Sequence, residues 1–167
     1  AANVVLGQPN FDTAPAPVNL TNLSLPGSQT TMLTPVAVSS DGTRLIVSDL
    51  GYNRVLIYNS IPTQNQAPAD VVLGQIDFTK TFSNQAQDLC VSAGTDADGN
   101  KLYPPRCAAT MNFPRYAISD GQRLFVADGG NDRVLIFNPI PTVNGARAAV
   151  ILGQPDEFSS IVTSEIA

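Results

Sequence analysis

The chain has 167 residues, of which 43% are hydrophobic and 14% are charged, and its formal net charge is −5. This length and apolar content are enough for one globular domain with a buried core. A net negative chain does not attract phosphate backbones, and no run approaches the roughly 18 apolar residues of a membrane span. We therefore expect neither nucleic-acid binding nor membrane insertion.

Residues 1–8 read AANVVLGQ, and the VVLGQ phrase returns at residues 71–75 and, as VILGQ, at residues 150–154. Short apolar runs of this kind predict β-strands. In the two later places the phrase closes a longer repeated block, whereas residues 1–8 carry it alone. We predict that they form an orphan outer strand that pairs with the open edge of another sheet.

Residues 9–34 are predicted to be a connecting loop. They contain two sequons for N-linked glycosylation, at Asn19 and Asn22, which are consistent with an exported protein. The sequence before this loop lacks the basic-then-apolar profile of a signal peptide.

Residues 35–75 and 114–154 align without a gap, and 24 of the 41 positions are identical. Self-similarity of this kind indicates a repeat architecture. In the first copy the runs PVAVSS, TRLIVSD, NRVLIY and ADVVLG have period-two apolar patterns, which predict four strands. Four antiparallel strands per copy are typical of a β-propeller blade, and a superhelical stack of sheets is the alternative. We predict an all-β fold with two such units.

Turn residues separate the predicted strands. Asp-Gly dipeptides at residues 41–42 and 120–121 accept the positive φ of a tight hairpin between the first and second strands. Gly51 and Gly130 are predicted to supply the same conformational freedom before the third strand.

Residues 76–113 connect the two units and are far longer than the usual loop of about 4–6 residues. They contain Cys90 and Cys107, for which we predict a disulfide that contributes about 3 kcal/mol in the chain-entropy model. Two free thiols are the alternative. A disulfide indicates an oxidising compartment, so we expect a secreted, periplasmic or cell-surface protein.

Long loops often carry recognition residues. Within residues 76–113 we predict contacts to a ligand from Phe78, Phe82, Tyr103 and Arg106. The alternative is that these aromatic side chains cover the gap between the two units.

The same connection gathers oxygen-bearing side chains at Asp96, Asp98 and Asn100, which suit calcium. Their spacing does not fit an EF-hand, and the tip of a glycine-containing hairpin is the alternative explanation. Calcium is the one cofactor that the sequence suggests.

Each unit contains an aspartate five residues before an arginine, namely Asp49 with Arg54 and Asp128 with Arg133. Across a tight turn these groups can pair in a bidentate manner. Because the pair recurs in both units, we predict a structural role, and the absence of histidine removes the commonest general base. We do not expect an enzyme. Residues 155–167 are predicted to be a C-terminal tail.

The stretches PVAVSSDGTRLIVSDLGYNRVLIY and PRYAISDGQRLFVADGGNDRVLIF resemble the NHL repeat, and the outer strand ending in Leu-Gly-Gln resembles a bacterial subset of these repeats. The chain departs from the usual pattern at Ala37 and Tyr116, where the family has glycine. The resemblance implies blades of a β-propeller that typically has six. Two blades do not close a ring, so the resemblance also implies that partners are further NHL blades of the same chain or of another copy.

The sequence thus leads to two functional hypotheses. The first is a non-catalytic, extracytoplasmic module that binds protein or glycan through its loops or assembles through its strands, in a closed ring or an open array. The second is a fragment of a calcium-dependent propeller enzyme of the lyase or hydrolase type.

Overall fold

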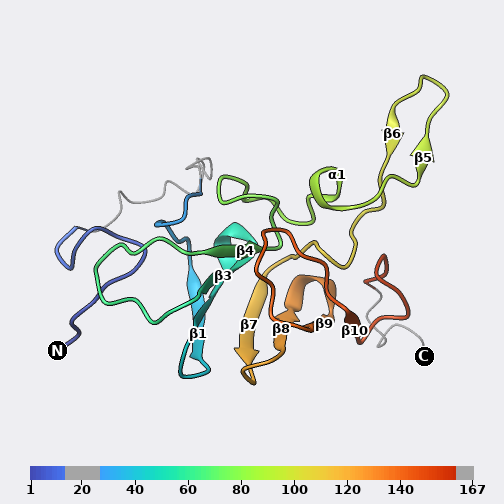
Figure 1. Ribbon diagram of the computed structural model, residues 1–167. Coiled ribbons are helices and arrows are strands. Elements are labelled where there is room, and N and C mark those ends of the chain that lie inside the picture. Colours follow the sequence, from blue (N-terminus) through green and yellow to red (C-terminus); the bar gives the residue numbers. More distant parts are fainter. Residues whose placement is uncertain (14–26, 161–167) are drawn as a thin grey trace, which may run out of the picture.

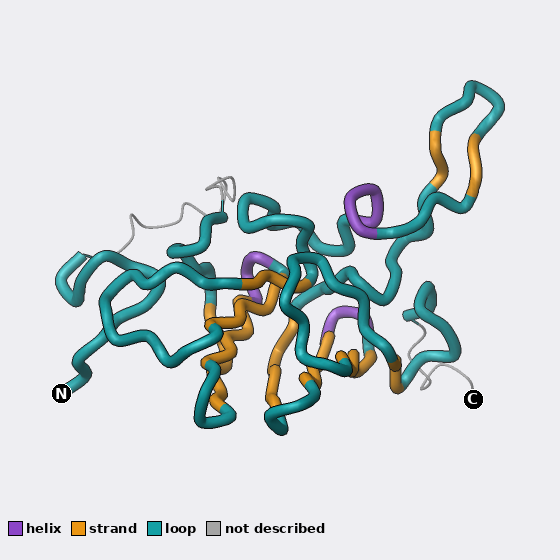
Figure 2. Tube along the Cα trace, viewed as in Figure 1, coloured by secondary structure: helices purple, strands orange, loops and turns teal. Residues whose placement is uncertain are grey.

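The computed structural model describes residues 1–13 and 27–160. In this part of the chain two four-stranded antiparallel sheets lie beside each other, and a two-stranded hairpin projects away from them (Figure 1). The expected all-β fold is confirmed, and long loops make up most of the remainder (Figure 2). Both sequons, at Asn19 and Asn22, lie outside the described residues.

The strands of each sheet follow one another in chain order. Sheet 1 contains β1 (Pro35–Ser40), β2 (Leu45–Asp49), β3 (Arg54–Tyr58) and β4 (Val71–Leu73). Sheet 2 contains β7 (Pro114–Ser119), β8 (Leu124–Asp128), β9 (Arg133–Phe137) and β10 (Val150–Leu152). In chain order, the segment that joins the two sheets contains α1 (Ala86–Leu89) and the hairpin of β5 (Gly94–Thr95) and β6 (Lys101–Leu102). Short 3-10 turns, η1 (Leu50–Tyr52) and η2 (Gly129–Asn131), precede the third strand of each sheet.

The two sheets repeat each other in register as well as in sequence. Both have a register shift near the start of the first strand, between Pro35 and Ala37 in sheet 1 and between Pro114 and Tyr116 in sheet 2. The predicted Asp-Gly hairpins are confirmed, because the second residue of each has a φ near +90°. The eight strands predicted within the two copies are therefore all present.

The prediction for Gly51 and Gly130 is wrong. The left-handed residues before the third strands are Asn53 and Asp132, with φ of 52° and 50°. Glycine is needed at the predicted positions because a Cβ at Gly51 would collide with the carbonyl oxygen of Leu33, and a Cβ at Gly130 would meet Asn112 in the same way.

The main core lies between the two sheets. Sheet 1 and sheet 2 contribute opposite faces to this core, so the core residues of one sheet are not the equivalents of those of the other. The buried residues from sheet 1 are Ile46, Val55, Ile57, Val71 and Leu73, and those from sheet 2 are Ala117, Leu124, Val126, Leu135 and Phe137. Near the first strands, the hydroxyl of Ser39 donates to the carbonyl oxygen of Ala117 at 2.7 Å.

The orphan strand expected at residues 1–8 is not formed, because no described strand pairs with this segment. A β-strand needs a neighbouring strand for its backbone groups, whereas the N–H and carbonyl groups of Val5 bind Asn65 and Gln66. The segment instead lies over the second face of sheet 1, where Leu6 and Met32 pack against Val47, Leu56 and Val72.

A buried ion pair ties each sheet to its connections. Arg54 Nε donates to Asp49 Oδ2 at 2.9 Å, and both side chains are 0% exposed. The contact is a single hydrogen bond, not the bidentate pair that we expected. The remaining guanidinium donors bind the carbonyl oxygens of Ser28, Thr31 and Phe78. Residues before β1 and after β4 are thereby fixed to the sheet.

Sheet 2 repeats this centre at the equivalent positions. Arg133 Nε donates to Asp128 Oδ2 at 2.8 Å, and the other donors bind the carbonyl oxygens of Cys107, Thr110 and Glu157. Each partner lies 79 residues after its counterpart in sheet 1. The structural repeat therefore extends beyond the predicted units, from residue 28 to 78 and from residue 107 to 157, and the predicted tail begins inside it.

We expect Arg54→Leu to lower the free energy of unfolding by about 3–5 kcal/mol, because it leaves a buried carboxylate and three carbonyl groups without their donor. The matched control is Arg123→Leu, which removes an ion pair with Asp120 whose partners are 50% and 36% exposed. The control should cost less than about 1 kcal/mol. Urea unfolding of the oxidised protein measures both, and equal effects would contradict the structural role of the buried pair.

Candidate functional site

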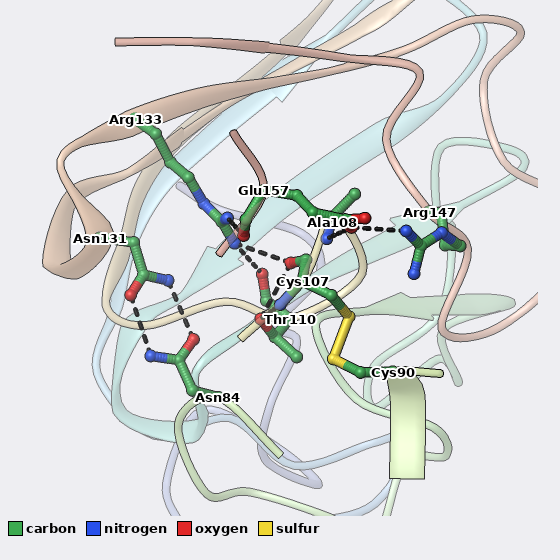
Figure 3. The surroundings of a disulfide bond; sticks show 9 residues. All are labelled: Asn84, Cys90, Cys107, Ala108, Thr110, Asn131, Arg133, Arg147 and Glu157. Carbon is green, nitrogen blue, oxygen red and sulfur yellow. Dashed lines mark hydrogen bonds and ion pairs between the residues drawn. A yellow bond between two sulfur atoms is a disulfide. The ribbon is translucent and has the colours of Figure 1, made fainter. Parts of the chain in front are cut away.

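The predicted disulfide is formed between Cys90 and Cys107, with Cα atoms 5.8 Å apart (Figure 3). It lies in a small apolar cluster with Ala86 and Ala109. The carbonyl oxygen of Cys107 accepts a hydrogen bond from Arg133, so the disulfide joins the long connection to the ion-pair centre of sheet 2.

Two further contacts hold the connection in place, and both are drawn in Figure 3. Asn84 and Asn131 exchange two side-chain amide hydrogen bonds of 2.9 Å. The Glu157 carboxylate accepts from the backbone N–H of Ala108 and pairs with Arg147. These contacts fix the long connection beside sheet 2, and the β5–β6 hairpin projects from it (Figure 1).

The long connection carries a groove of about 630 Å³ between residues 80–88 and residues 101–105. Two of the four predicted contact residues, Phe82 and Tyr103, line it, and the Phe82 side chain is exposed. The other two lie elsewhere. Phe78 packs against the second face of sheet 1, and Arg106 donates to the carbonyl oxygen of Phe158.

The residues suggested for calcium lie at the tip of the β5–β6 hairpin. Asp96 Oδ1 accepts from the backbone N–H groups of Asp98 and Asn100, and Asp96 Oδ2 accepts from the Asn100 side chain. The hydrogen bonds lower the pKa of Asp96, with the Asn100 side chain the largest cause. These contacts form the turn of a hairpin, which was the alternative explanation, and calcium binding stays a prediction. Among the described residues no three His, Cys, Asp or Glu side chains form a metal-holding group.

The clearest difference between the two units is the exposure of one sheet face. In sheet 1, Val71 and Leu73 are 2% and 0% exposed because sheet 2 covers them. Their equivalents in sheet 2, Val150 and Leu152, are 47% and 52% exposed. We call this face the trailing flank of sheet 2. By strand register it consists of Phe125, Ala127, Val134, Ile136, Val150 and Leu152.

The outer edge of the sheets differs in the same way. In sheet 1 the Val72 N–H donates to Asn144 Oδ1 at 3.0 Å, and the Val72 carbonyl accepts from the Gly145 N–H at 2.9 Å. We call residues 28–78 unit 1 and residues 107–157 unit 2. Asn144 and Gly145 of unit 2 thus hold the outer strand of unit 1, and we call such a pair of residues a clamp. Ile151 is the equivalent of Val72 in unit 2, and it makes no hydrogen bond outside its sheet to any described residue.

Unit 1 has a clamp of its own, and it holds the N-terminal segment. The Val5 N–H donates to Asn65 Oδ1 at 2.9 Å, and the Val5 carbonyl accepts from the Gln66 N–H at 2.9 Å. Asn65 and Gln66 lie 79 residues before Asn144 and Gly145. Val5 thus takes the position relative to unit 1 that Val72 takes relative to unit 2. Gly7 repeats the backbone conformation of Gly74, each with a φ of 85°.

The repeated glutamine was not among the residues singled out from the sequence. Gln75 is fully buried, and its Nε2 donates to the carbonyl oxygens of Tyr52, Asn53 and Phe82. Gln154 makes the two equivalent contacts in unit 2. The side chain fixes the end of the outer strand to the turn before the third strand. The recurrence of Leu-Gly-Gln was the available signal.

Comparison with models of known protein families gives no match, and comparison with curated proteins gives none either. The resemblance to NHL repeats therefore rests on the quoted residues alone. No helix among the described residues is long and apolar enough to cross a membrane.

The two buried carboxyl groups predict how stability depends on pH. Burial raises the pKa of Asp49 to about 6. The charge of Arg54 and the hydrogen bonds from Arg54 and the Leu33 N–H act in the opposite direction but are weaker. Burial also raises the pKa of Asp128. Hydrogen bonds from neighbouring backbone N–H groups lower the pKa of Asp41 and of Asp120 to about 2, so these two groups are ionised in both states above about pH 5.

We expect the free energy of unfolding to fall by on the order of 1 kcal/mol as the pH rises from about 5 to about 6.5. In this range the folded protein still holds a proton on Asp49 that the unfolded chain has released, so ionisation favours unfolding. Urea unfolding at each pH measures the effect, and a ¹³C NMR titration of the Asp49 carboxyl carbon assigns it. A titration midpoint below pH 4 would contradict this prediction.

Proposed function

We propose that the chain is a non-catalytic module of two β-propeller-type blades whose function is to join further units of the same kind. The joining surface is the trailing flank of sheet 2. The observation that carries this proposal is the exposure of Val150 and Leu152, whose equivalents in sheet 1 are buried by the next unit.

The contact between the two sheets supplies the pattern for the proposed contact. In that contact one flank of sheet 1 meets the opposite flank of sheet 2, so the interface is heterologous. A heterologous contact can repeat, because each added unit offers a fresh copy of the flank that was just covered. Repetition gives a closed ring if the rotation returns to its start and an open array if it does not. Exposed apolar sheet faces of this kind mark interaction surfaces.

The proposal places the module outside the cytoplasm, because the Cys90–Cys107 disulfide is compatible with an oxidising compartment. The groove lined by Phe82 and Tyr103 is the surface that we assign to a protein or glycan ligand. It lies on the connection rather than on a sheet flank, so the units can join without covering it.

Light scattering over a range of concentrations tests the assembly function. We expect the average mass to rise with concentration above the 17.6 kDa of one chain. The double variant Val150→Lys, Leu152→Lys places two charges on the trailing flank and should weaken association at least about tenfold, because each apolar side chain buried contributes about 1.5–3 kcal/mol.

The matched control is Val91→Lys, which alters an 80% exposed apolar residue of the disulfide-bonded connection, away from both flanks. It should associate as the unaltered chain does. A mass that stays at one chain throughout the range, or an equal loss of association in the control, would contradict the assembly function.

A further inference from the structure

We propose that residues 4–8 form a cap on unit 1, and that β10 of a second copy displaces this cap when two copies join. The proposal rests on the assembly function above and names the site on each copy. On one copy the site is the Asn65–Gln66 clamp, and on the other copy it is the outer edge of β10 at Ile151.

The cap and β10 are equivalent pieces of chain. Residues 4–8 read VVLGQ and residues 150–154 read VILGQ. The clamp residues on unit 1 bind Val5 as the clamp of unit 2 binds Val72, with one side-chain and one backbone hydrogen bond in each case. A second copy whose sheet 2 docks on unit 1 as sheet 1 docks on unit 2 would bring its Ile151 to the place that Val5 occupies. Only one of the two segments can bind there.

The two ends of the molecule are therefore different. On the second face of sheet 1, Leu6 helps to cover Val47, Leu56 and Val72, which are 4% exposed or less. On the trailing flank of sheet 2 no segment of the described chain covers Val150 and Leu152 in this way. In a heterologous contact each joint pairs the covered end of one copy with the uncovered end of another. The cap is what makes the covered end unreactive.

The cap is held by few contacts. Among the described residues, two hydrogen bonds to the clamp and the packing of Leu6 fix it, and no strand ladder contributes. By contrast β4 has three ladder pairs with β3 in addition to its clamp. An incoming β10 keeps its own ladder with β9 and offers the same two backbone groups to the clamp. Displacement thus exchanges equal hydrogen bonds and adds the contact between two sheet faces.

Two substitutions in the full chain test the cap. Val5→Pro removes the N–H that binds Asn65, and Gly7→Val places a side chain at a residue with a φ of 85°, which strains the segment. If the cap closes the clamp in about 90% of molecules, opening it fully raises the apparent association constant about tenfold. Light scattering measures association, and the melting curve of each variant verifies folding. Asn3→Pro is the control, because Asn3 precedes the residues that bind the clamp.

If one cap variant folds poorly, the other still carries the test, and a second arm checks that a gain comes from the open clamp. A synthetic peptide of residues 1–10, added in excess to the Val5→Pro chain, should bind the open clamp and reverse the gain in association. The double variant Val5→Pro, Ile151→Pro lacks the N–H offered by the incoming strand and should also lose the gain.

The outcomes separate the two proposals. A gain with both cap variants, absent in Asn3→Pro and reversed by the peptide, supports the cap. Equal association of the unaltered chain and the cap variants overturns the cap and leaves the assembly function standing. If neither the unaltered chain nor any variant associates, the assembly function fails and the cap fails with it.

Discussion

One buried arginine in each unit sets the geometry on which the rest of the structure depends. The side chains of Arg54 and Arg133 are 0% exposed, so every guanidinium donor must find its acceptor within the protein. One aspartate accepts from the Nε–H. Backbone carbonyl groups from the segments before the first strand and after the last strand accept from the remaining donors. Because the guanidinium is rigid and planar, it fixes where the chain enters and leaves each sheet. Consecutive units then repeat with one spacing and present the same flank.

That constraint explains why two units with the same fold and similar sequences differ so much in burial. Each sheet has two apolar faces, and a repeat of this kind covers one face of each unit with its neighbour. The inner faces meet in the main core, the outer face of sheet 1 lies under the N-terminal segment, and the trailing flank of sheet 2 has no such cover among the described residues. The asymmetry comes from position in the repeat, since 24 of 41 residues are the same in the two copies.

The sequence predicts those features that depend on local pattern. Period-two runs and Asp-Gly turns identify the eight strands of the two sheets, and the recurrence of Asp49 with Arg54 identifies a structural pair. The sequence does not predict features that depend on a neighbour. Residues 1–8 have a strand sequence, but a strand also needs a partner strand, and no described strand pairs with them. The buried role of Gln75 likewise depends on which carbonyl groups the fold brings within reach.

Residues 4–8 and β4 are equivalent segments that are bound with unequal strength, and this makes the two ends of the molecule different. β4 and residues 4–8 offer the same backbone groups to the same kind of clamp, yet only β4 is also part of a sheet. A segment bound by the clamp alone can leave without breaking a ladder, whereas β4 cannot. Exchange is therefore confined to the end that carries residues 4–8, and a strand that arrives already paired has the advantage, because its ordering entropy has been spent on its own sheet. The same argument makes the cap reversible, since it can return to the clamp whenever the second copy dissociates.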